Sequence, residues 1–363
     1  MKNIPFVVST LLAMVFLPLA DALAAPYSPA DWSNLVAAAQ KEGKVIVVGE
    51  TLAPAKDALL QAFKAKYGIN VEIMDGRGSE MVAKFMAERQ AGLYQRDVGL
   101  MGISTIVIEI KPQGITAPLE TILLLPEVLE GGKWRGGQLP FIDKEHHALA
   151  LTAMAVPCMI INTGLVPAGD IRQHTDLLQP KWKGKIVMTD ASTSGSGNNW
   201  FTHIMTNVYG QEKGRQFMQS LAKQDLMVTR DSRLQVEWVA RGKYPVGLAF
   251  SMSLATSFRK AGAPIAFPAL TEPSYLSGGS GNLFIFDKAP HPNAAKLFAN
   301  WLLSQEGSKV FAPALGYPSL RLDVPNDFVE AALIPPPGMT FRGQDDYVRS
   351  RGKMRKLAAE IFK

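Results

Sequence analysis

Residues 44–74, KVIVVGETLAPAKDALLQAFKAKYGINVEIM, decide the fold. The run KVIVVGE (44–50) is apolar and β-branched and follows Gly43, which is typical of a buried strand. Residues 54–67 carry apolar side chains at helical spacing and stop at Gly68, which favours a helix. INVEIM (69–74) repeats the strand pattern. This strand–helix–strand order predicts a parallel sheet covered by helices.

The same alternation extends along the rest of the chain. It predicts a further helix and strand at 79–92 and 97–102, and a second unit with strands at 185–190, 226–229 and 245–250 and helices at 198–210, 211–224 and 232–243. Long apolar stretches near 149–163 and 263–288 interrupt the alternation, and we expect hinge strands there that cross between two lobes. We therefore predict a two-lobed α/β fold, in which each lobe is a helix-flanked, mainly parallel sheet.

The predicted domain organisation has three parts. Residues 1–24 join Lys2, an apolar run and Ala22-Leu23-Ala24, which is the pattern of a secretory signal peptide and predicts a periplasmic location. Residues 25–150 and 263–363 are expected to form a discontinuous N-terminal lobe, and 151–262 the C-terminal lobe. No later run is apolar over the roughly 18 residues of a membrane span, so we expect a soluble exported protein.

Charge and cysteine content narrow the function classes. The formal net charge is +6 with the basic residues scattered, so we expect no nucleic-acid partner, although a mild positive field favours small anionic ligands. The one local cluster, RSRGKMRK (349–356), is interpreted as one face of a terminal helix. Cys158 is the only cysteine, so no internal disulfide can form.

Three short polar turns stand between a predicted strand and a predicted helix. Free N–H groups and the positive dipole end at a helix N-terminus favour an anion, and ligands of such sheets bind at the carboxyl ends of strands. The candidate ligand residues in these turns are Arg77, Gly78 and Ser79; Ser192, Thr193, Ser194, Gly195, Ser196 and Gly197; and Ser232 and Arg233. Tyr275, in the Gly/Ser-rich loop TEPSYLSGGSGN (271–282), is a further candidate that could reach a cleft.

Patterns for catalysis and for metal binding are missing from the sequence. It has no G-x-S-x-G, Walker A or H-E-x-x-H motif and no Cys/His cluster, so we expect no enzyme, no cofactor and no resident metal. Two alternatives stay open. One is a bound metal with a synergistic anion on the 192–197 turn and Tyr275 and histidines as ligands. The other is a secreted enzyme with Ser194 or Ser196 as nucleophile and His203 as the nearest base.

Five segments of the sequence carry a family resemblance. They are FKAKYGINV (63–71), GRGSEMVAKFMAERQ (76–90), WKGKIVMTD (182–190), VARGKYPVGLA (239–249) and PNAAKLFANWLLSQEG (292–307). Together with the exported start, the chain resembles the extracellular solute-binding proteins of ABC transporters, in the two-lobed type II class related to ferric-ion-binding proteins.

The resemblance implies a monomeric Venus flytrap that closes on its ligand and presents the closed form to a permease in the inner membrane. It adds Thr51, Ser104, Ser251 and Ser253 to the expected ligand residues. Ferric-binding members carry two adjacent tyrosines directly after the strand that here is PVGLAF, whereas this chain continues SMSLATSF (251–258). The positions of the family's acidic and histidine ligands fall near Gly102 and Leu52. A ferric ion needs anionic oxygen donors, so we expect a small organic anion instead, either a carboxylate or a phosphorylated compound.

Overall fold

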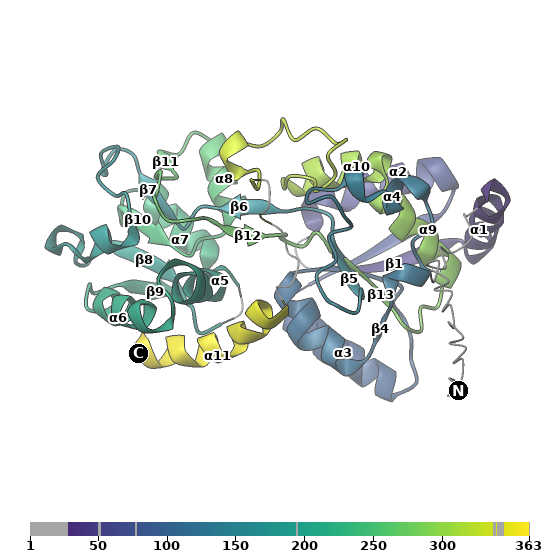
Figure 1. Cartoon of the computed structure of the whole chain (residues 1–363), viewed down its shortest axis with the longest axis horizontal. Helices are drawn as coiled ribbons and strands as arrows, with labels where there is room; N and C mark the ends of the chain where they lie inside the picture. The colour runs from purple at the N-terminus through teal and green to yellow at the C-terminus, as the bar shows by residue number, and fades with distance from the viewer. Residues whose placement is uncertain are drawn as a thin grey trace, which may run out of the picture.

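The computed structural model describes residues 28–49, 52–76, 78–193, 195–336, 339 and 345–362. The expected signal peptide (1–24) and the candidate ligand residues Thr51, Arg77 and Ser194 lie outside the described residues. Figure 1 shows two lobes side by side, with extended chain passing between them.

The first lobe is built on a six-stranded sheet of order β2-β1-β3-β13-β4, in which β5 also pairs with β13. Its strands are β1 (Lys44–Gly49), β2 (Asn70–Asp75), β3 (Val98–Met101), β4 (Thr116–Ala117), β5 (Ala148–Ala150) and β13 (Asn282–Phe286). As predicted, β1 runs parallel to β2 and β3. The sequence did not indicate an orientation for β13, which runs antiparallel to β3. Helices of this lobe are α1 (Pro29–Glu42), α2 (Ala53–Tyr67), α3 (Gly78–Gln90), α4 (Pro126–Leu129), α9 (Pro292–Leu303) and α10 (Gln305–Leu315).

The second lobe is built on a five-stranded sheet of order β11-β7-β10-β8-β9. Its strands are β7 (Met159–Asn162), β8 (Ile186–Thr189), β9 (Met227–Thr229), β10 (Val246–Leu248) and β11 (Ile265–Ala266). Its helices are α5 (Ser196–His203), which continues into a π-helical turn (Ile204–Val208), α6 (Gln211–Ala222), α7 (Ser232–Ala240) and α8 (Met252–Lys260). Since β10, β8 and β9 are parallel neighbours, the turns that follow them open at one edge of the sheet.

Two strands between the lobes pair with each other. β6 (Met154–Val156) and β12 (Tyr275–Ser277) form an antiparallel two-stranded sheet. The chain runs from β5 in the first sheet through β6 to β7 in the second, and returns from β11 through β12 to β13. The crossing strands therefore lie inside the two apolar stretches that the sequence suggested as hinges, 149–163 and 263–288.

The C-terminal helix α11 (Asp345–Ile361) departs from the expected division of the chain. The sequence assigned all of 263–363 to the first lobe. Val348 does lie in the first lobe's core, but Met354 and Ala358 are buried in the core of the second. Because α11 carries its apolar stripe along its whole length, it buries each half on a different lobe, and Figure 1 shows it running from the junction along the second lobe.

Candidate ligand-binding cleft

A cavity of about 330 Å³ lies between the lobes. The first lobe and the hinge strands contribute one part of its wall and the turns after β8, β9 and β10 contribute the other. It is lined by Val156, Gly195, Ser196, Asn199, Ser232, Phe250, Ser251, Met252, Ser253, Tyr275, Ser277, Gly279, Ser280, Leu315 and Tyr317. This volume is at the lower end of the range for small-molecule sites.

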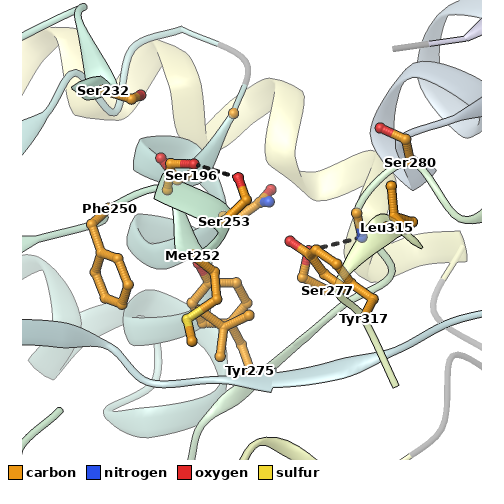
Figure 2. A pocket seen from close by; sticks show the side chains of 15 residues that line it. Ser196, Ser232, Phe250, Met252, Ser253, Tyr275, Ser277, Ser280, Leu315 and Tyr317 are labelled. Atoms are coloured by element: carbon orange, nitrogen blue, oxygen red, sulfur yellow. Dashed lines mark hydrogen bonds between the residues drawn. The ribbon is translucent and has the colours of Figure 1, made fainter. Parts of the chain in front are cut away.

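The cavity has both a polar and an apolar lining. Serine hydroxyls come from four separate turns, and Figure 2 shows Phe250, Met252 and Tyr275 on one side with Leu315 and Tyr317 on the other. Among the lining residues that the structure describes, none is Asp, Glu, Lys, Arg or His. Hydroxyl and amide groups therefore supply its polar contacts, and no lining carboxylate repels an anion.

The N-terminus of α5 opens onto this cavity. Gly195 is the N-cap residue, with φ 132° and ψ −159°, and it has no side chain with which to accept the first N–H groups of the helix. Gly197 brings α5 close to β8, because a Cβ atom there would be 2.7 Å from the Thr189 carbonyl oxygen and closer still to that of Asp190. The backbone conformation at Gly195, which only glycine adopts readily, thus leaves the first turn of α5 without a side-chain cap from its N-cap residue.

The N-termini of α8 and α7 differ in how they are capped. Ser251 is the N-cap residue of α8, yet its hydroxyl makes no capping hydrogen bond and instead lies 3.2 Å from the Ser253 hydroxyl. In α7, Asp231 accepts hydrogen bonds from the N–H groups of Arg233 and Leu234, both at 2.9 Å. The α7 terminus is thus capped by Asp231 while Ser232 lines the cavity, whereas the N-cap residues of α5 and α8 make no capping hydrogen bond.

Some residues of the 192–197 turn stabilise the turn itself, and others line the cavity. Ser192 donates through its N–H (2.8 Å) and its hydroxyl (2.6 Å) to Asp190 Oδ1, and the Thr193 hydroxyl donates to the Asp190 carbonyl oxygen at 3.1 Å. Burial opposes ionisation of Asp190, but the hydrogen bonds from Ser192 and that from Arg230 Nε at 2.9 Å lower the pKa of its carboxyl. Ser192 and Thr193 therefore shape the turn, and Gly195 and Ser196 line the cavity.

Of the remaining candidate ligand residues, some line the main cavity and others do not. Ser232, Ser251, Ser253 and Tyr275 line the main cavity. The Arg233 guanidinium instead packs over the Phe258 ring, 5.7 Å from its centre. Gly78 and Ser79 form the first turn of α3.

Tyr275 is buried and stays neutral. Burial raises the pKa of its hydroxyl well above the ordinary value, so it can act as a hydrogen-bonding group but is a poor source of the phenolate that a ferric ion requires. No group of three or more His, Cys, Asp or Glu side chains with metal-binding geometry occurs within the part of the chain that the structure describes.

His203, the base considered for an enzyme, is buried and hydrogen-bonded inside the protein. Its Nε2 donates to the Pro273 carbonyl oxygen at 2.8 Å, and its Nδ1 accepts from the Asn207 amide at 3.2 Å. Burial lowers the pKa of the imidazole to about 4. Both ring nitrogens are occupied, so this histidine is unsuited to take a proton from a serine.

A second hollow of about 110 Å³ adjoins the main cavity and shares Gly195, Asn199, Ser277 and Gly279 with it. Ser104, at the start of the π-helical segment Thr105–Ile110, lines it from the first lobe. Its one charged lining residue among those described is Arg351 of α11. Sequence reasoning missed Arg351 because it interpreted the whole basic cluster 349–356 as one face of a terminal helix. The spacing of the helix could have indicated this burial, because Arg351 is three residues from Val348 and three from Met354, which both lie on the apolar face of α11.

The two sheets, the paired crossing strands and the interlobe cavity together define a two-lobed solute-binding protein. A model of the bacterial extracellular solute-binding protein family matches residues 58–336. The chain therefore belongs to this family, whose members bind a solute for an ABC transporter. No helix among the described residues is both long enough and apolar enough to cross a bilayer.

Similar proteins show how broadly this architecture is used. An uncharacterized protein of Haemophilus influenzae is 24% identical over 279 residues, which cover 75% of this chain and 76% of the relative. Iron-bound HitA from Pseudomonas aeruginosa has a TM-score of 0.68 at 18% identity, over 88% of this chain and 99% of HitA. AfuA from Actinobacillus pleuropneumoniae, with fructose-6-phosphate bound, has a TM-score of 0.65 at 19% identity, over 88% and 97%. At these identities the solved structures establish the shared fold.

Proposed function

We propose that this protein captures a small anionic organic solute, a carboxylate or a phosphorylated compound, between its two lobes and delivers it to an ABC permease. The observation that carries the proposal is the opening of two uncapped helix N-termini, those of α5 and α8, onto one hydroxyl-lined cavity without a lining carboxylate. Each terminus offers free N–H donors and the positive end of a helix dipole.

The chemistry of the lining favours an organic anion over a metal cargo. HitA carries iron and AfuA a sugar phosphate in their structures, so the fold is compatible with either. In this chain β10 is followed by Phe250, Ser251, Met252 and Ser253, which offer hydroxyl and apolar contacts and no anionic oxygen. A cation would lack the charged donors that it needs, whereas an anion finds only hydrogen-bond donors and uncharged groups.

Closure follows from contacts to both lobes. The turns after β8, β9 and β10 hold the solute from the second lobe, and Gly279, Ser280 and Tyr317 contact it from the opposite wall. A ligand that touches both walls stabilises the closed arrangement by its differential affinity for that state. We further propose that the protein acts as a monomer in the periplasm and has no nucleic-acid partner.

Thermal unfolding of the purified protein across a panel of carboxylates, phosphorylated compounds, neutral sugars and metal ions tests the proposal. We expect at least one anion to raise the unfolding temperature in a saturable way, because a ligand that binds only the folded state stabilises it. Stabilisation by a neutral sugar or by ferric ion, with no response to any anion, would refute it. Native mass spectrometry of freshly purified protein gives a second reading, since a retained solute reveals its own mass.

A further inference from the structure

Arg351 is a buried charge in the space between the lobes. Its residue is 2% exposed, and it lies on α11 at the point where the helix passes from the first lobe's core to that of the second. Its Nη1 donates to the Ser104 hydroxyl of the first lobe at 2.6 Å, and its guanidinium lies 5.1 Å from the centre of the Tyr347 ring.

This guanidinium has an N–H donor without a hydrogen-bond partner among the described residues. It is always protonated and carries five N–H donors, and its buried Nε has no hydrogen-bond partner among the described residues. No described carboxylate forms an ion pair with it. Burial of a charge without an opposite charge is unfavourable, so a structure that retains one is prepared for a partner that arrives from outside.

The N-terminus of α5 lies on the same hollow as Arg351. Gly195, the N-cap residue of that helix, and Asn199, in its first turn, line both this hollow and the main cavity. An anionic group placed here would meet the guanidinium and the free N–H groups together. Such charge-assisted contacts are about twice as strong as neutral ones.

We propose that Arg351 is the side chain that binds the anionic group of the ligand, and that an uncharged, hydroxyl-bearing remainder of the ligand fills the main cavity. This inference rests on the proposed function and specifies its ligand as a polyhydroxylated monoanion, such as a sugar acid. One guanidinium matches one negative charge, and the serine hydroxyls of the main cavity match the hydroxyl groups of the ligand while Phe250 and Tyr317 contact its carbon skeleton.

A matched series of probes separates charge from shape. D-glucitol, D-gluconate and D-glucarate are open-chain six-carbon compounds that carry no, one and two negative charges. Calorimetric titration of the wild-type protein should show gluconate binding at least tenfold more tightly than glucitol, because only gluconate pairs with Arg351. Glucarate should bind more weakly than gluconate, since its second carboxylate meets no described cation.

Variants of Arg351 test the residue itself. Arg351→Met should weaken gluconate binding at least tenfold, and Arg351→Lys should lose part of the affinity because a lysine keeps the charge without the planar set of donors. Arg349→Gln is the matched control, since it removes an arginine from the exposed side of the same helix and should leave the affinity unchanged.

The unfolding temperature without ligand distinguishes a binding role from a merely structural one. If Arg351 waits for an anion, Arg351→Met removes an uncompensated buried charge and the ligand-free variant should unfold at the same or a higher temperature. If Arg351 only holds the lobes together through Ser104, the variant should unfold at a lower temperature and still bind gluconate as the wild type does.

Each outcome has a defined consequence. Unchanged gluconate affinity in Arg351→Met overturns the role of Arg351 and leaves the proposed function intact. Tighter binding of glucarate or glucitol than of gluconate, or no binding of any of the three, overturns the monoanion class. The wider anion panel with the wild-type protein decides the proposed function separately.

Discussion

Ser251 offers the sharpest test of the open helix terminus at α8. The residue has the extended backbone of an N-cap, φ −80° and ψ 115°, but its hydroxyl leaves the first N–H groups of α8 without a side-chain acceptor. Ser251→Asp supplies that acceptor together with a negative charge, and Ser251→Asn supplies the acceptor alone. Both substitutions therefore place a new acceptor, and Ser251→Asp also a negative charge, in the main cavity that we assign to the uncharged part of the ligand.

The two effects of Ser251→Asp have opposite signs. A capping carboxylate at a helix N-terminus should stabilise the protein by about 0.5–1 kcal/mol. The new charge acts from a distance on an anionic group beside Arg351, and two like charges about 8 Å apart repel by about 2 kcal/mol at an effective dielectric constant of about 20. Ser251 is only half-buried, so solvent screening should reduce this to about 1 kcal/mol, or roughly fivefold weaker anion binding.

Urea unfolding and calorimetric titration with the best-bound anion measure these quantities. We expect Ser251→Asp to unfold at higher urea concentration than the wild type and to bind the anion roughly fivefold more weakly. Ser251→Asn should show a similar gain in stability with a smaller loss of affinity, because it blocks the donors without repulsion. Wild-type affinity in Ser251→Asp would refute the assignment of the α8 terminus to the ligand.

Two further predictions concern the second lobe. Gly197→Ala forces a Cβ atom against the backbone carbonyl oxygen of Asp190, so urea unfolding should show that the free energy of unfolding falls by about 1–3 kcal/mol. The control is Gly132→Ala, where an added Cβ would have no neighbouring atom of the described residues within 4 Å and the free energy of unfolding should change by less than about 0.5 kcal/mol. Burial lowers the pKa of His203 from its ordinary 6.5 to about 4, so the unfolded chain takes up the proton first as pH falls and the stability present above 6.5 is lost between these values. His203→Asn should therefore lose about 2 kcal/mol less than the wild type between about pH 7.5 and about pH 5, and an identical loss in both proteins would contradict the buried neutral imidazole.

The turns could be located from the sequence, but the sequence did not show which of their residues stabilise the turn and which line the cavity. Strand endings and helix starts are local patterns, and they correctly indicated the turn at 192–197 and the one containing Ser232. Which hydroxyl faces the ligand depends on competition inside the folded turn. Asp190 takes the hydroxyl hydrogens of Ser192 and Thr193 because it is fixed at the end of β8, and this leaves Ser196 for the cavity.

The capping of α7 shows the same limit on a smaller scale. The sequence favoured Ser232 as the hydroxyl at the start of that helix. Asp231 is the residue that accepts the first N–H groups, and Ser232 is thereby released toward the cavity. A shift of one residue decides which group is a cap and which is a ligand contact.

The sequence by itself determined the two-lobed α/β architecture, the crossing strands and the absence of the tyrosine pair after β10. These features depend on local periodicity and on residue identity, which can be read without coordinates. Only the tertiary structure decided where α11 lies and that Arg351 enters the space between the lobes. The position of this helix depends on packing between residues more than a hundred positions apart, such as Arg351 and Ser104, and no pattern within the helix encodes its partner.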